Sequence, residues 1–149
     1  MTLKNTLIIF DFNRTLFDPE EGSLIPGAHE ILAHLQNAGA TLYLVSRLEP
    51  GRAGVVERLG LDSYFAGTTF VEEKSAELFE DILQKHPVPR ERVYVVGDHL
   101  HGEIRHGNSC LFRTIWLKRG KFQTLTPEVP EDVPWRTITN LIETLTHIT

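Results

Sequence analysis

Short apolar runs without polar alternation recur along this chain, and segments with helical spacing separate them. The runs span residues 7–12, 42–46, 93–96 and 114–117, and the pair Phe70-Val71 marks the end of a further one. Continuous apolar runs of this length are typical of strands buried on both faces, as in a parallel sheet. Strands that alternate with helices therefore predict an α/β fold in which helices cover both faces of the sheet.

The helical segments differ in how clearly the sequence marks them. The clearest covers residues 28–38, which follow Pro26-Gly27 and stop at Gly39, so that proline precedes the helix and glycine ends it. A second apolar stripe over residues 76–83 follows Ser75, which we expect to be its N-cap. Weaker helical patterns occupy residues 52–59, 102–108 and 136–146.

Composition narrows the class of protein. The 149 residues contain no repeat or linker, which indicates a single domain over residues 1–149. The net charge of −5 disfavours nucleic-acid binding by bulk charge. The longest apolar stretches, residues 7–10 and 42–45, are far shorter than the roughly 20 residues that cross a bilayer. Cys110 has no partner and no secretory signal is evident, so we expect a cytoplasmic protein with Cys110 in its core.

Polar residues that can carry chemistry follow the predicted strands. In open parallel sheets, ligands bind at the carboxyl ends of the strands, so these residues are expected to converge there. They are Asp11, Asn13, Arg14 and Thr15 after the first strand, Ser46 and Arg47 after the second, Lys74 before a helix, and Asp98 and Glu103 after the fourth.

These residue types supply the parts of metal-assisted phosphoryl transfer. A carboxylate such as Asp11 can attack phosphorus and form an aspartyl phosphate. Mg²⁺ held by Asp11, Asp98 and a backbone carbonyl near Asn13 would neutralise the approach of two anions, with Glu103 orienting metal-bound water or taking part directly. Lys74, the Ser46 hydroxyl and backbone N–H groups after the first strand would hold the remaining phosphate oxygens.

Four motifs in order resemble those of the haloacid dehalogenase-like (HAD) superfamily. They are Asp11-Phe12-Asn13-Arg14-Thr15, the strand 42–46 ending in Ser46, Lys74 at a helix start, and Gly97-Asp98 followed by Glu103. The resemblance implies a Rossmann-like, doubly wound sheet of about five parallel strands and a magnesium-dependent phosphatase.

The resemblance also implies roles for individual residues. Asp11 is the expected nucleophile, with Asn13, Ser46 and Lys74 as the other catalytic positions. The expected phosphate-binding residues are Asp11, Phe12, Asn13, Ser46, Arg47 and Lys74. The expected Mg²⁺ ligands are Asp11, Asn13, Asp98 and Glu103.

Asn13 departs from the family pattern, which has aspartate at this position as the general acid and base. An amide cannot transfer this proton, and general acid–base help contributes about 10²–10⁴ in rate. Three explanations stay open: an enzyme for activated leaving groups or with another acid such as His99 or His101, a catalytically inactive module that binds phosphate or phosphoproteins, and a deliberate inactivating change. A receiver domain is the other α/β class with a phosphorylated aspartate, but the order of the acids does not fit it.

The chain leaves no room for a cap domain. Asp11 and Ser46 are 35 positions apart and Ser46 and Lys74 are 28 apart, whereas a folded insertion needs at least about 50 residues. We expect an open site with a small flap at residues 18–24. Capless members of the family act on large substrates or close their sites by oligomerising, which implies a macromolecular phosphoester or a small substrate covered by a second subunit of a homo-oligomer.

Several residues also have simpler interpretations. Lys74 lies among glutamates and Glu103 in a first helical turn, so each can be an ordinary ion-pairing or solvated residue. Arg14 and Arg47 either contact the phosphate or form surface salt bridges. The spacing of His99, His101 and His106 matches no standard zinc ligand set. A last group of basic residues lines either the substrate mouth or a solvated edge: Arg113, Lys118, Arg119 and Lys121.

Overall fold

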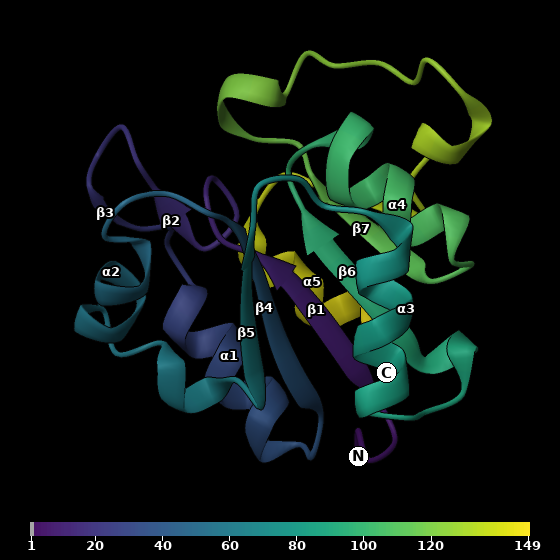
Figure 1. The fold of residues 1–149 in the computed structure, drawn as a ribbon, viewed down its shortest axis with the longest axis horizontal. Coiled ribbons are helices and arrows are strands. Elements are labelled where there is room, and N and C mark those ends of the chain that lie inside the picture. The colour runs from purple at the N-terminus through teal and green to yellow at the C-terminus, as the bar shows by residue number, and fades with distance from the viewer. Residues whose placement is uncertain (1) are drawn as a thin grey trace.

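A computed structural model describes residues 2–149 and shows one six-stranded parallel sheet (Figure 1). The strand order is β5-β4-β1-β6-β7-β8, so that β1 lies between β4 and β6. The strands of this sheet are β1 (Leu7–Asp11), β4 (Thr41–Arg47), β5 (Gly67–Val71), β6 (Val93–Gly97), β7 (Arg113–Leu117) and β8 (Arg136–Ile138). The doubly wound α/β class is confirmed, and its switch point is at β1, from which the chain proceeds first to one side and then to the other.

Helices cover both faces of the sheet (Figure 1). On one face lie α1 (Ala28–Asn37) and the short α5 (Thr144–His147), and on the other lie α3 (Ala76–Lys85) and α4 (Arg105–Ser109). The remaining α-helix is α2 (Arg52–Arg58), and a π-helical turn, Leu100–Ile104, leads into α4. The Ser75 side chain caps α3 as expected, because its hydroxyl accepts a hydrogen bond from the Leu78 N–H at 3.1 Å.

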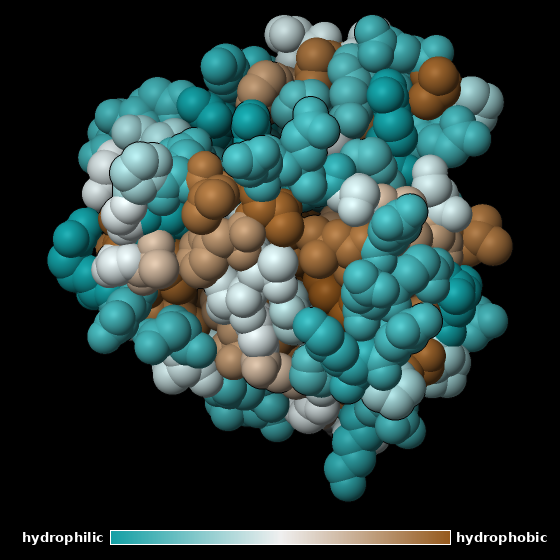
Figure 2. Space-filling view, in the orientation of Figure 1, coloured by the Kyte–Doolittle hydropathy of each residue, from teal (hydrophilic) through white to brown (hydrophobic). Residues whose placement is uncertain are grey.

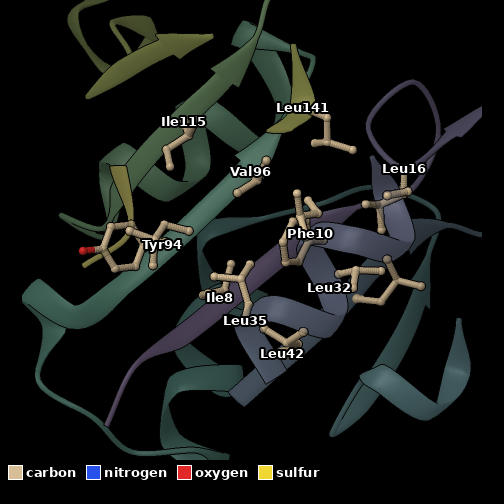
Figure 3. Close-up of a cluster of buried hydrophobic side chains, with 14 of the residues drawn as sticks. Ile8, Phe10, Leu16, Leu32, Leu35, Leu42, Tyr94, Val96, Ile115 and Leu141 are labelled. Carbon is tan, nitrogen blue, oxygen red and sulfur yellow. The ribbon is translucent and has the colours of Figure 1, made fainter. Parts of the chain in front are cut away.

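Each face of the sheet has its own buried apolar cluster, as alternating strand residues point to opposite sides. The cluster beneath α1 contains Ile8, Phe10, Leu42, Val96 and Ile115 among others (Figure 3). The cluster beneath α3 takes the intervening strand residues and includes the buried thiol of Cys110, which confirms its expected place in the core. Figure 2 shows hydrophobic residues in a band across the middle of this face, with hydrophilic side chains above and below it.

The C-terminal segment differs from the expected helix over residues 136–146. Residues 136–138 instead form β8, which pairs in parallel with β7 and brings the sheet to six strands. The Asn140 side chain then caps a short 3₁₀ turn before α5 by accepting from the Ile142 N–H at 3.2 Å. Strand pairing overrides the local helical spacing here because β7 offers an otherwise unpaired edge.

The expected flap is a hairpin of β2 (Phe17–Asp18) and β3 (Ser23–Leu24). It leads into Ile25, which is buried in the same cluster as the α1 side chains. Apart from this hairpin, the described residues between β1 and β4 form only α1 and its connections, so no cap domain is inserted there. Residues 2–149 contain no helix with the length and hydropathy that crossing a bilayer requires.

Candidate active site

Asp11 is the last residue of the central strand β1 and ends in a buried position at the carboxyl edge of the sheet. Its Oδ2 accepts a hydrogen bond from the Thr15 hydroxyl at 3.0 Å, and its Oδ1 accepts one from the Lys74 ammonium. In the turn after β1, Arg14 adopts a left-handed conformation with φ of 60°. Both carboxylate oxygens are therefore oriented by neighbouring donors.

Lys74 lies between two carboxylates. Besides Asp11, its Nζ donates to Glu103 Oε1 at 2.9 Å, and the Lys74 side chain is only 9% exposed. Burial alone would lower the pKa of Lys74, but the Asp11 and Glu103 carboxylates outweigh it and hold the pKa above its ordinary value. Lys74 is therefore a permanent cation at the centre of the site rather than a surface lysine.

Glu103 reaches the site from the π-helical turn after β6. Its Oε2 accepts a hydrogen bond from the His99 backbone N–H at 2.8 Å. A Cβ at Gly97 would overlap the Glu103 carboxylate, so the glycine of the Gly97-Asp98 motif is needed for this close approach. The simpler interpretation of Glu103 as a solvated helix residue is wrong, because the side chain is buried in the site.

Asp98 completes a group of three acids. One carboxylate oxygen each from Asp11, Asp98 and Glu103 lies within 4.8 Å of the other two. The Trp116 indole N–H holds the Asp98 backbone by donating to its carbonyl oxygen at 2.8 Å, whereas the buried Asp98 Oδ2 has no hydrogen-bond partner. Burial, followed by repulsion from the other two acids, raises the pKa of Asp98 to about 10.

Three buried carboxylates with a single ammonium leave this group short of positive charge. Carboxylate oxygens are the ligands that Mg²⁺ prefers, and an orphaned carboxylate oxygen among them is an available ligand position. The residues present therefore fit a divalent cation, held by Asp11 and Asp98 with Glu103 beside them.

Asn13 lines the same cleft, two residues beyond Asp11. Its buried Oδ1 accepts no hydrogen bond from the described residues, so this atom makes no structural contact of that kind with them. Of the two histidines considered as substitutes for the missing acid, His99 lines the cleft and packs against Phe122, with ring centroids 4.3 Å apart and the rings tilted by 45°. Burial lowers the pKa of His99, and His101 adds to this shift.

The Ser46 hydroxyl lies near the end of β4 and is held by a residue that sequence reasoning missed. Arg52 Nη1 donates to Ser46 Oγ at 2.9 Å, and the Arg52 guanidinium also forms an ion pair with Glu49. Arg52 lies over the Phe12 ring, with 5.1 Å between its Cζ and the ring centroid. Its side chain is only 9% exposed, so Arg52 links the segments of the first two motifs through buried contacts.

These residues line a cleft of about 430 Å³ at the carboxyl ends of the strands. Arg47 and Lys121 lie on its wall and are exposed. Arg14 also lines the cleft but pairs with Glu20 at 3.0 Å. The Phe12 side chain is buried, so any contact of Phe12 with a ligand here falls to its backbone.

The remaining basic and histidine residues have structural contacts. Among the basic residues near β7, Arg119 lies 3.5 Å from Asp18 and Lys118 lies over Trp116, so only Lys121 reaches the cleft wall. Within residues 2–149, the histidines at 99, 101 and 106 form no common ligand group.

A second group of potential ligands, His101 with Glu128 and Asp132, lies apart from the reacting centre. Arg105 already pairs with both of its acids, donating to Asp132 Oδ1 at 2.6 Å and to Glu128 Oε1 at 3.3 Å. His101 is committed to this network, because its Nε2 also lies 2.9 Å from the Thr126 carbonyl. The group therefore holds the loop before β8 against the start of α4.

Comparisons with known proteins agree with this arrangement. A family model described as haloacid dehalogenase-like hydrolase matches residues 4–108, and a second, described as HAD-hydrolase-like, matches residues 74–144. A curated glyceraldehyde 3-phosphate phosphatase of Pyrococcus furiosus is 27% identical over 113 residues, which cover 72% of this chain and 47% of that protein. One of Methanopyrus kandleri is 32% identical over 82 residues, covering 52% of this chain and 35% of that protein.

A solved structure of the HAD-hydrolase YfnB of Bacillus subtilis, bound to magnesium, is similar with a TM-score of 0.72 and 25% identity. The match covers 87% of this chain and 58% of that one. The chain thus spans about half or less of the length of the curated relatives it matches.

Proposed function

Because this chain belongs to the haloacid dehalogenase-like hydrolase family, we propose that it is a magnesium-dependent phosphatase that acts through a phosphorylated Asp11. The observation that carries this proposal is the position of Asp11. Its carboxylate is oriented by Lys74 and Thr15 and lies within 4.8 Å of the oxygens of Asp98 and Glu103. The names of the curated relatives support a phosphate ester as the substrate.

The chemistry follows from the charges of these residues. An Asp11 carboxylate oxygen forms a bond to phosphorus while the bond from phosphorus to the leaving oxygen breaks. Water then attacks the phosphorus of the aspartyl phosphate while its bond to the Asp11 oxygen breaks, which releases inorganic phosphate, passes a proton to solvent and restores the Asp11 carboxylate. Lys74 supplies a fixed positive charge next to the attacking carboxylate, and the Ser46 hydroxyl, positioned by Arg52, is a donor for a phosphate oxygen. When bound, Mg²⁺ would neutralise the phosphate oxygens and the acids at 11, 98 and 103.

Asn13 slows both steps, because each step requires a proton transfer at this position. Its amide can hydrogen-bond to the leaving oxygen or to water but cannot donate or remove a proton. We therefore propose an enzyme with weak turnover that favours leaving groups stable as anions, such as aryl and acyl phosphates. The second step also lacks its base, so the aspartyl phosphate persists longer than it would with aspartate at position 13.

The test is phosphate release from p-nitrophenyl phosphate, phenyl phosphate and acetyl phosphate, with and without magnesium. We expect Asn13→Asp to raise turnover by about 10²–10⁴, with the largest gain for phenyl phosphate, whose leaving group is the most basic of the three. Asp11→Asn is the matched inactive control. Magnesium-dependent turnover that survives Asp11→Asn would refute the proposed nucleophile.

One observation favours a different function, a module that binds phosphate or phosphoproteins without turnover. Asn13 replaces the proton-transferring residue while the other charged groups of the site remain in place. This alternative predicts no phosphate release from either the parent or Asn13→Asp, although both bind magnesium and remain folded.

The cleft volume favours a small phosphorylated substrate over a macromolecular one, because sites of about 300–1,000 Å³ are typical of small-molecule binding. We also propose that a second subunit of a homo-oligomer covers the site and that the protein is cytoplasmic. The unpaired cysteine Cys110 supports the location, since extracellular domains more often carry disulfides.

A further inference from the structure

The cleft wall carries positively charged side chains in addition to Lys74 at the reacting centre. Beyond the three acids and Lys74, the charged side chains that line the cleft are four basic residues and one acid: Arg14, Arg47, Arg52, Lys121 and Glu49. Their formal sum is +3, whereas the whole chain carries −5. Positive charge is therefore concentrated at the mouth against the overall balance of the protein.

Two of these cations have no acidic partner within residues 2–149. Arg14 pairs with Glu20, and Arg52 pairs with Glu49. Within residues 2–149, neither the Arg47 nor the Lys121 side chain forms a hydrogen bond or an ion pair, and Lys121 Nζ lies 5.4 Å from the centroid of the Phe122 ring. Both side chains are exposed, so both are available to a ligand.

The two cations come from chain segments on opposite sides of β1 in the sheet, and both line the cleft. Arg47 ends β4, on one side of β1, and Lys121 follows β7, which lies beyond β6 on the other side. Asp11 at the end of β1 and Asp98 after β6 lie between them. The leaving group of a substrate bound at Asp11 would extend into the cleft that Arg47 and Lys121 line.

The transferred phosphoryl group already has partners in Lys74, Ser46 and the acid group that fits a divalent cation. The unpartnered cations therefore act on the rest of the substrate. Resting on the proposed function, we propose that the preferred substrate is a small phosphate ester whose leaving group carries a second anionic group, a carboxylate or a phosphate, recognised by Arg47 and Lys121. Such a substrate differs from glyceraldehyde 3-phosphate, named for the curated relatives, whose leaving group is uncharged.

The expected preference is moderate because both cations are exposed. A hydrogen bond to a charged group contributes on the order of 1.5–3 kcal/mol, which corresponds to roughly tenfold or more in affinity for each contact that forms. Salt screens exposed charges over about 10 Å at 0.1 M ionic strength. The preference should therefore weaken as salt is added, which a purely steric preference would not do.

The experiment compares matched substrates on the Asn13→Asp background, where the missing proton donor does not limit the rate. Glyceraldehyde 3-phosphate and 3-phosphoglycerate differ by a carboxylate on the leaving group, and fructose 6-phosphate with fructose 1,6-bisphosphate tests a second phosphate. We expect kcat/KM to favour the more anionic member of at least one pair by about tenfold. Arg47→Met with Lys121→Met should remove this ratio, and added salt should reduce it.

The matched control is Arg58→Met with Lys85→Met, which changes the net charge equally. Both residues are exposed and lie in the last turns of α2 and α3, away from the cleft. The control should leave the substrate ratio unchanged. The proposal is overturned if the Asn13→Asp protein shows substrate ratios near one, or if its preference survives loss of Arg47 and Lys121. An equal loss of preference in the control, or faster turnover of a phosphoserine peptide, also overturns it.

Failure of the proposed function gives a different result. If no phosphate ester, including p-nitrophenyl phosphate, is hydrolysed with magnesium, the phosphatase proposal fails, and calorimetric binding to Asp11→Asn still decides the inference. Tighter binding of 3-phosphoglycerate than of glyceraldehyde 3-phosphate, lost with Arg47 and Lys121, supports the second anion site. Equal binding of the two compounds overturns it.

Discussion

Asp98 provides the sharpest test of how charge is balanced in the site. Its carboxylate is buried, lacks a partner at Oδ2, and faces two other acids. Its pKa of about 10 in the folded protein lies above the ordinary 3.8, so the folded state binds this proton more tightly than the unfolded state does. Without metal, Asp98 therefore contributes stability at low pH that is lost progressively as the pH rises from about 4 toward 10.

The perturbation is Asp98→Asn, which keeps the shape and removes the ionisable group. At a working pH of about 7, only the part of the pKa shift between 3.8 and this pH affects stability, which is roughly 3 pKa units. At about 1.4 kcal/mol per unit, Asp98 lowers the free energy of unfolding at this pH by at most about 4 kcal/mol. Buried charges relax and admit water, so we expect about half of this, on the order of 2 kcal/mol. For a domain of this size that raises the Tm of the metal-free variant by about 4–8 °C.

The assay is thermal unfolding followed by circular dichroism, in EDTA and in magnesium. At low pH, near 4, the parent and Asp98→Asn should unfold at similar temperatures, because both are then neutral at position 98. Magnesium at about ten times its Kd should stabilise the parent by about 1.4 kcal/mol and the variant by much less. Asp81→Asn, on the exposed side of α3, is the matched control and should change neither result.

Two results would refute this reasoning. One is a metal-free Asp98→Asn protein that unfolds several degrees below the parent at neutral pH. The other is equal stabilisation of both proteins by magnesium, which would mean that the cation binds without Asp98.

Three further predictions concern other parts of the molecule. Lys74→Met leaves Asp11 and Glu103 without their shared cation, so urea unfolding should show a loss of about 3–5 kcal/mol, and an unchanged midpoint would contradict this ion-pair role. Arg52→Lys keeps the charge but cannot donate to Ser46 and Glu49 at the same time, so inhibition by orthovanadate should weaken by about tenfold. Unchanged inhibition would mean that Arg52 contributes only packing contacts. The hydrogen bond from Arg105 lowers the pKa of Asp132 to about 2. In chemical unfolding at neutral pH, Asp132→Asn should therefore be less stable than the parent by about 2 kcal/mol, and the difference should close as the pH falls from about 4 toward 2. A difference independent of pH would contradict this.

The sequence predicted the central part of the fold because its strands are continuous apolar runs, which are typical of parallel strands buried on both faces. The runs at residues 7–12 and 93–96 became the adjacent central strands, and Ser75 began α3 where its side chain could cap the helix. The last strand was missed because residues 136–138 are two exposed positions and one buried one. Only pairing with β7 makes this segment a strand, and pairing is not visible in local spacing.

The site was predictable to the extent that its residues follow strands. Asp11, Ser46 and Asp98 converge because the carboxyl ends of parallel strands share one edge. Arg52 was not found, since it belongs to a helix with a weak pattern and reaches Ser46 only through the turn between β4 and α2. The division of the histidines was equally hidden: His99 faces the cleft, whereas His101, two residues on, joins the network of Asp132.

The central claim is that Asp11 becomes phosphorylated. The most direct measurement is incubation with acetyl phosphate and magnesium, followed by reduction with borohydride and mass spectrometry of the peptide that contains residue 11, because borohydride converts an aspartyl phosphate to homoserine. The account predicts homoserine at position 11, dependent on magnesium and present in larger amount in the parent than in Asn13→Asp. Unmodified Asp11 in both proteins, or reduction at another acid, would contradict it.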